Sequence, residues 1–207
     1  MKLGRKKGCQ MNKIVICAIA LVVFTFATWP CMAAEKVLYN FEKDAEGWEI
    51  PEWALEKQDY VGRAVERSGD AAKDGKGSLR LDCGFPGKVW AAGIVEVAES
   101  LNLADYGSIS CDVYLPKDAP SGLEAMIILT VGESWKWVEM SRGVFLVPGE
   151  WTTLTGGLLP GVTSWRRTIV DENFRKDIRK IDIRIESDKK PIYKGPVYID
   201  NIRVGSK

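Results

Sequence analysis

The stretch IRKIDIRIE, residues 178–186, alternates apolar and charged side chains. Successive side chains of an extended chain point to opposite faces. Ile181, Ile183 and Ile185 therefore share one face, and the charged residues between them share the other. The stretch predicts a β-strand with one buried face.

The same period of two recurs along most of the chain after residue 35. It occupies residues 37–41, 79–83, 90–97, 108–115, 123–131, 134–140, 143–147, 151–154 and 197–204. Glycine and proline turns such as 132–133 and 148–149 separate these runs, and only residues 171–179 favour a helical turn. We therefore predict an all-β sandwich or barrel of short strands.

Charge is unevenly distributed along the 207 residues. Residues 1–34 carry five basic and no acidic side chains, whereas residues 35–207 carry 24 basic and 28 acidic ones. The length and the apolar content of 46% suit one globular domain. The mild acidity argues against a nucleic-acid partner, because phosphate binding needs a clustered positive field.

The first 34 residues have the order of a secretory signal peptide. Basic residues end at Lys13, an apolar run covers residues 14–27, and the small pair Ala33-Ala34 follows. We predict cleavage after Ala34, a domain over residues 35–207, and a secreted or periplasmic protein. The apolar run is shorter than the roughly 20 residues of a membrane span, so we expect no stable anchor after cleavage. An uncleaved anchor, or a lipid on Cys31, is the alternative.

Two cysteines, Cys83 and Cys111, fall in the predicted strands among apolar neighbours. Both are expected to point into the core. An oxidising compartment permits a disulfide between them, and two buried free thiols are the alternative.

The chain contains no histidine. This excludes Ser-His-Asp and Cys-His nucleophiles and the common zinc sites. A glycosidase needs only two carboxylates, and Glu139 with Asp112 or Asp182 is the candidate pair. Acids on strands are more typical of solvated faces, so we predict that the protein is not an enzyme.

Tryptophan is abundant, with seven residues after position 34. Trp48 and Trp151 are expected in the core. Trp135 and Trp137 lie two apart in a predicted strand, so we expect them to share one face with Glu139. That face is either buried or a binding surface.

An exposed face of this kind would suit a sugar. The apolar C–H face of a pyranose stacks on an indole ring, and charged side chains bind its hydroxyl groups. The candidate carbohydrate-binding residues are Trp90, Trp135, Trp137, Glu139, Asp112, Tyr114 and Arg184. A solvated sheet face without a ligand is the competing interpretation.

Several motifs together resemble a known family. They are Tyr39–Glu42 with Glu46–Trp48, then residues 75–81, 149–154, 178–183 and 195–202. In order and spacing they resemble carbohydrate-binding modules with the galactose-binding-domain-like jelly roll, over about residues 37–204. The resemblance implies an antiparallel two-sheet jelly-roll sandwich.

The resemblance also implies a structural calcium ion between the first and last strands. Glu42 and Asp200 match its acidic positions, with oxygens from the turn that begins at Asp74. The alternation slips between Ile199 and Ile202, which predicts a β-bulge at Asp200-Asn201.

The sequence thus predicts a secreted, non-catalytic carbohydrate-binding module. Its partner would be a poly- or oligosaccharide, and a separate glycan-active enzyme would be a second partner. A structural or protein-interaction sandwich of the cell envelope is the alternative, and a glycan-active hydrolase is less favoured.

Overall fold

The computed structural model describes residues 35–189 and 191–207. The predicted signal peptide, its cleavage position and Cys31 lie outside the described residues. No described helix is long and apolar enough to cross a membrane.

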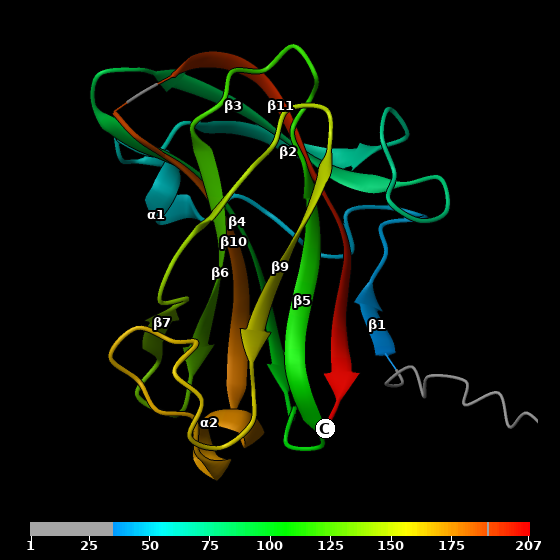
Figure 1. The fold of residues 1–207 in the computed structure, drawn as a ribbon, viewed down its shortest axis with the longest axis vertical. Helices are drawn as coiled ribbons and strands as arrows, with labels where there is room; N and C mark the ends of the chain where they lie inside the picture. Colours follow the sequence, from blue (N-terminus) through cyan, green and yellow to red (C-terminus); the bar gives the residue numbers. More distant parts are fainter. Residues whose placement is uncertain (1–34, 190) are drawn as a thin grey trace, which may run out of the picture. The chain divides into compact units, whose positions relative to one another are not determined.

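The regular secondary structure of the described chain is almost all antiparallel strand (Figure 1). They are β1 (Glu35–Tyr39), β2 (Gly62–Ser68), β3 (Ser78–Pro86), β4 (Trp90–Leu101), β5 (Tyr106–Tyr114), β6 (Leu123–Val131), β7 (Lys136–Glu139), β8 (Val144–Phe145), β9 (Trp151–Gly157), β10 (Ile178–Asp188) and β11 (Ile192–Ser206). Two short helices accompany them, α1 (Glu52–Leu55) and α2 (Glu172–Lys176). The predicted helical turn within residues 171–179 is therefore confirmed.

The strands form two sheets. The first sheet has the order β2-β3-β11-β5-β9, with β1 paired to β11. The second has the order β4-β10-β6-β7, with β8 paired to β6. Most neighbours in each sheet, such as β3 with β11 and β4 with β10, come from distant parts of the sequence, as in a jelly roll, and the predicted all-β two-sheet sandwich is confirmed.

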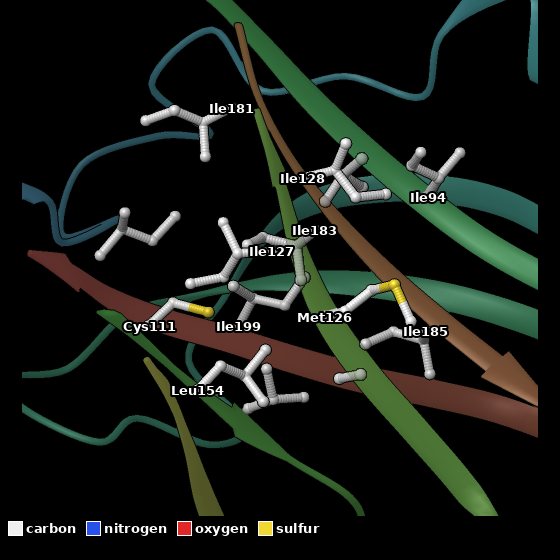
Figure 2. Close-up of a cluster of buried hydrophobic side chains, with 14 of the residues drawn as sticks. Ile94, Cys111, Met126, Ile127, Ile128, Leu154, Ile181, Ile183, Ile185 and Ile199 are labelled. Carbon is white, nitrogen blue, oxygen red and sulfur yellow. The ribbon is translucent and has the colours of Figure 1, made fainter. Parts of the chain in front are cut away.

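The core lies between the inward faces of the two sheets. Ile181, Ile183 and Ile185 of β10 are all buried, as their alternation predicts. Figure 2 shows Ile183 beside Ile127 of β6, with Ile199 of the first sheet facing them. Contact between these apolar faces removes both from water and stabilises the sandwich.

The two cysteines and Trp48 lie in the core, as predicted, but Trp151 does not. Cys83 and Cys111 are buried free thiols, and burial raises the pKa of both. Trp48 is buried edge-on against Tyr39. The prediction that Trp151 is a core residue was wrong.

Trp151 pairs across the strands with Tyr114 on the outward face of the first sheet. Its ring centroid lies 5.3 Å from that of Tyr114, and it remains partly exposed. The inward residue of β9 is Leu154, which is fully buried. The alternation of β9 is therefore correct, but Trp151 belongs to its outer side.

Candidate functional site

The outward face of the second sheet brings together four of the predicted residues, Trp90, Trp137, Glu139 and Arg184. Arg184 of β10 lies opposite Met126 of β6, and Glu139 of β7 lies opposite Ile128. Arg184 Nη1 donates a hydrogen bond of 2.8 Å to Glu139 Oε1. Trp137 precedes Glu139 by two residues on the same strand face and is 39% exposed.

Glu139 is the centre of this arrangement. Trp137 Nε1 donates to its Oε1 at 3.1 Å, and Arg166 Nη1 donates to its Oε2 at 3.3 Å. Burial alone would raise the pKa of Glu139, but the donors Trp137, Arg184 and Arg166 hold that pKa below its usual value. The carboxylate is thus held ionised and oriented.

A series of aromatic rings surrounds Arg184. Trp90 lies 5.8 Å from Tyr60, Tyr60 lies 4.8 Å from Trp53, and Trp53 lies 6.0 Å from Trp137. All these distances join ring centroids, and all three pairs are edge-to-face, a favoured aromatic geometry. The series extends from β4 to β7 across the second sheet.

Trp53 and Tyr60 were not predicted as site residues. They lie in and after α1, where no strand alternation marks an outward face. Backbone hydrogen bonds between Glu49 and Glu96, of 3.0 and 2.8 Å, attach this segment to β4. The abundance of tryptophan in the sequence pointed only toward Trp53, and no signal pointed toward Tyr60.

Three adjoining hollows form one groove on this face. Their volumes are about 350, 400 and 380 Å³, and Glu139 lines all three. We call it the Glu139 groove and define it by Trp53, Tyr60, Trp137, Glu139, Arg166 and Arg184. It offers aromatic faces and fixed charged hydrogen-bonding groups side by side.

The prediction that Trp135 shares a face with Trp137 was wrong. β7 begins at Lys136, and Trp135 lies in the turn before it with a left-handed φ of 52°. The centroid of its ring lies 5.3 Å from the Arg179 guanidinium, so Trp135 packs on Arg179 outside the Glu139 groove. The turn extends over residues 132–135, two residues longer than predicted, and this removes Trp135 from the strand.

Asp112 and Tyr114 lie on the first sheet, away from the Glu139 groove. Asp112 is fully buried, and its Oδ2 accepts hydrogen bonds from Arg203 Nη1 at 2.7 Å and Asn201 Nδ2 at 3.1 Å. Tyr114 packs against Trp151. Alternation places residues on a face but does not say which of two sheets carries it.

The candidate pairs of catalytic carboxylates are not assembled for an open site. Glu139 and Asp112 belong to different sheets. Asp182 shares the second sheet with Glu139 but is fully buried, and it lies opposite Glu96 of β4. Burial and the neighbouring Glu96 raise the pKa of Asp182 well above its usual value.

Three solved structures share the architecture that carries this groove. CBM27-1 of Caldicellulosiruptor saccharolyticus, in complex with mannohexaose, has a TM-score of 0.58 at 20% identity and covers 83% of this chain and 97% of its own. CBM28, a module specific for non-crystalline cellulose, has a TM-score of 0.59 at 18% identity, covering 85% and 98%. TmCBM27, studied for mannan recognition, has 0.51 at 17% identity, covering 85% and 97%.

This chain has the fold of these carbohydrate-binding modules. The predicted jelly-roll resemblance is thereby confirmed for the path of the chain. No protein-family model and no curated protein matches the sequence. The side chains of the Glu139 groove must therefore be interpreted from their own chemistry.

The residues predicted for the calcium of carbohydrate-binding modules surround the loop 73–77. Glu42 Oε1 accepts backbone N–H bonds from Lys76 at 2.8 Å and Gly77 at 3.0 Å. Asp200 Oδ2 accepts one from Lys73 at 2.8 Å. Both carboxylates therefore hold the same loop.

The donor set around this loop has the chemistry that calcium prefers. Glu42, Asp74 and Asp200 line a hollow of about 160 Å³ together with two asparagines. The described residues hold no group of three or more acidic or cysteine side chains close enough to share a metal ion. A calcium ion here would thus need backbone carbonyl oxygens beside Glu42 and Asp200.

Proposed function

We propose that this protein is a secreted, non-catalytic carbohydrate-binding module that holds a poly- or oligosaccharide in the Glu139 groove. The observation that carries the proposal is the joining of Trp53, Tyr60 and Trp137 to the ion pair of Glu139 and Arg184 within one open hollow. The fold, shared with modules described as binding mannohexaose and non-crystalline cellulose, supports it.

The binding follows from the two kinds of surface on a sugar ring. The exposed indole of Trp137 stacks on the C–H face of a pyranose. The guanidinium of Arg184 donates to ring hydroxyls, and the ionised Glu139 accepts from them. Because the ion pair already fixes both groups, little side-chain entropy is lost on binding.

The groove is open along the sheet, which suits a chain rather than a single enclosed sugar. Open, hydrated sites of this kind have dissociation constants from about millimolar to micromolar, or roughly −4 to −8 kcal/mol. Secretion would bring the protein to such a polymer, and a separate glycan-active enzyme remains the predicted second partner.

Affinity electrophoresis through gels that contain mannan, soluble cellulose derivatives, xylan or galactan tests the proposal. We expect at least one polymer to retard the wild-type protein and Trp137→Ala to reduce that retardation about tenfold or more, since stacking on one ring contributes about 1–3 kcal/mol. Trp135→Ala is the matched control and should migrate as wild type. Unretarded migration of the wild type on every glycan, charged or neutral, would refute the proposal.

We also propose that the loop 73–77 binds a structural calcium ion through Glu42 and Asp200. The support is the oxygen-rich hollow at the junction of β11 with the segment after β1. Such an ion would stabilise the fold without contacting the glycan.

A further inference from the structure

The Glu139 groove has a charge opposite to that of the domain around it. Residues 35–207 carry 28 acidic and 24 basic side chains. The walls of the three hollows instead carry six basic side chains and three acidic ones. The basic residues are Lys57, Lys136, Arg142, Arg166, Arg167 and Arg184, and the acidic ones are Glu124, Glu139 and Glu186.

Two of the acidic groups are already paired inside the groove. Glu139 binds Arg184 and Arg166, and Glu186 Oε2 lies 2.8 Å from Arg184 Nε. By contrast, Lys57, Lys136, Arg142 and Arg167 are exposed and form no ion pair with any carboxylate in the described part of the chain. The uncompensated charge at the rim is therefore positive.

Local structure holds several of these cations in place. Arg166 N donates a backbone hydrogen bond of 2.8 Å to Glu139 O, which attaches the segment carrying Arg167 to β7. Arg167 has a left-handed φ of 51°, so the chain turns sharply there. Lys57 Nζ lies over the Trp53 ring, 4.8 Å from its centroid, and is held there next to the exposed ring of Trp137.

We propose that the Glu139 groove selects a polysaccharide that bears negative groups, carboxylates or sulfates, on its sugar rings. The inference rests on the proposed function of the groove as a glycan site. A ring stacked on the aromatic series places its substituents near the rim cations, where guanidinium groups bind carboxylate and sulfate oxygens in pairs. A neutral glycan would leave these cations without anionic partners.

The test compares each charged polymer with its own neutral form. Polygalacturonate is paired with its carboxyl-reduced form, and a sulfated galactan with its desulfated form, in affinity gels and by calorimetry. We expect at least one charged form to bind about tenfold more tightly than its neutral form. A difference between polygalacturonate and its reduced form identifies the bound group as a carboxylate, and a difference between the sulfated and desulfated galactan identifies it as a sulfate.

Salt and variants separate this electrostatic contribution from stacking. Raising sodium chloride from 0.1 to 1 M shortens the screening length from about 10 to about 3 Å and should reduce only the preference for the charged polymer. Arg142→Gln with Arg167→Asn should weaken binding of the charged form about fivefold, because exposed pairs contribute up to about 1 kcal/mol each. Asparagine is chosen at 167 because it tolerates left-handed backbone. Lys194→Gln, an exposed lysine on β11 of the first sheet, is the matched control.

The outcomes distinguish this inference from the proposed function. Equal or tighter binding of both neutral forms, or of neutral glycans alone, would overturn the inference and leave the glycan site standing. A double variant that binds the charged polymer like wild type would also overturn it. Retardation by no glycan, charged or neutral, would refute the function itself.

Discussion

Asp182 takes the outward position that the alternation of β10 predicts, but it is not exposed to solvent. It alternates with the core isoleucines of β10 and points outward, as its position predicts. It is nevertheless fully buried, and it lies opposite the carboxyl of Glu96 on β4. Burial disfavours the charged form of Asp182, and the nearby Glu96 carboxyl disfavours it further, so the pKa of Asp182 rises and the proton stays on it.

This raised pKa makes stability depend on pH with a definite sign. Near pH 3, below the usual pKa of a carboxyl, the folded and unfolded states are both protonated and the contribution of Asp182 is fully present. As pH rises through the folded pKa this contribution is lost, by about 1.4 kcal/mol for each unit between the two pKa values. Asp182→Asn stays neutral at every pH.

We therefore expect Asp182→Asn to exceed the wild type in free energy of unfolding at pH 8, and to match it more closely near pH 3. Urea denaturation across this pH range measures the difference. Asp188→Asn, at an exposed position of the same strand, should show no such gain. A D182N variant that is less stable than the wild type at pH 8 would contradict the assignment of a protonated Asp182.

Residue identity alone also misled at Trp135 and Asp112. Whether an aromatic or acidic side chain reaches a site depends on turn length and on sheet membership. Trp135 left the strand because the turn occupies four positions, and Asp112 became a buried partner of Arg203. The alternation of side chains along a strand predicts neither the length of a turn nor the sheet to which the strand belongs.

At the level of elements, the bulge in β11 was predicted and is confirmed. The pairing of β11 with β5 shifts register between Asp200 and Arg203, and Asn201 has a left-handed φ of 52°. Its Nδ2 donates to Asp74 at 3.0 Å and to Asp112 at 3.1 Å. The bulge thereby turns one side chain toward both the loop 73–77 and the buried Asp112.

Two substitutions at Asn201 separate backbone strain from these hydrogen bonds. Asn201→Gly and Asn201→Ala both lose the Nδ2 donor, but only alanine also suffers the steric cost of left-handed backbone. We expect Asn201→Ala to be less stable than Asn201→Gly by about 1–2 kcal/mol in chemical denaturation. Equal losses for the two variants would mean that the strain contributes nothing measurable.

Strands with one buried face were predictable from the sequence. Two elements that lack such a face, β2 and α1, were not predicted. β2, with the sequence GRAVERS, is an edge strand whose middle residues are largely exposed, so it shows no apolar alternation. α1 is only four residues long. β2 depends on its pairing with β3, and α1 depends on the flanking residues that are hydrogen-bonded to β4, rather than on a pattern of their own.

At the level of the whole molecule, β11 joins the first sheet together. It pairs with β1, β3 and β5 along its length. The loop 73–77, which Glu42 and Asp200 hold by hydrogen bonds, closes against this strand. A ligand bound there in the folded state alone stabilises the entire sandwich.

Calcium should therefore raise the unfolding temperature of the whole protein. At a calcium concentration a hundred times the dissociation constant the expected gain is about 2.7 kcal/mol. Differential scanning calorimetry with calcium and with a chelator measures it. Glu42→Gln should abolish the calcium dependence, whereas Glu56→Gln, an exposed residue after α1, should retain it. An unfolding temperature that calcium does not change would refute the calcium site.

The sequence by itself determined the strand-rich class, the inward residues of most strands, the bulge and the absence of histidine chemistry. These depend on local alternation and composition, which a linear chain carries. The tertiary structure alone decided the Glu139 groove, because Trp53, Trp137 and Arg184 meet only when the segment around α1 is attached to β4 and β7 joins the far side of the second sheet. It also decided that Asp182 is buried, since burial depends on what packs over a face, and alternation specifies only which face a residue takes.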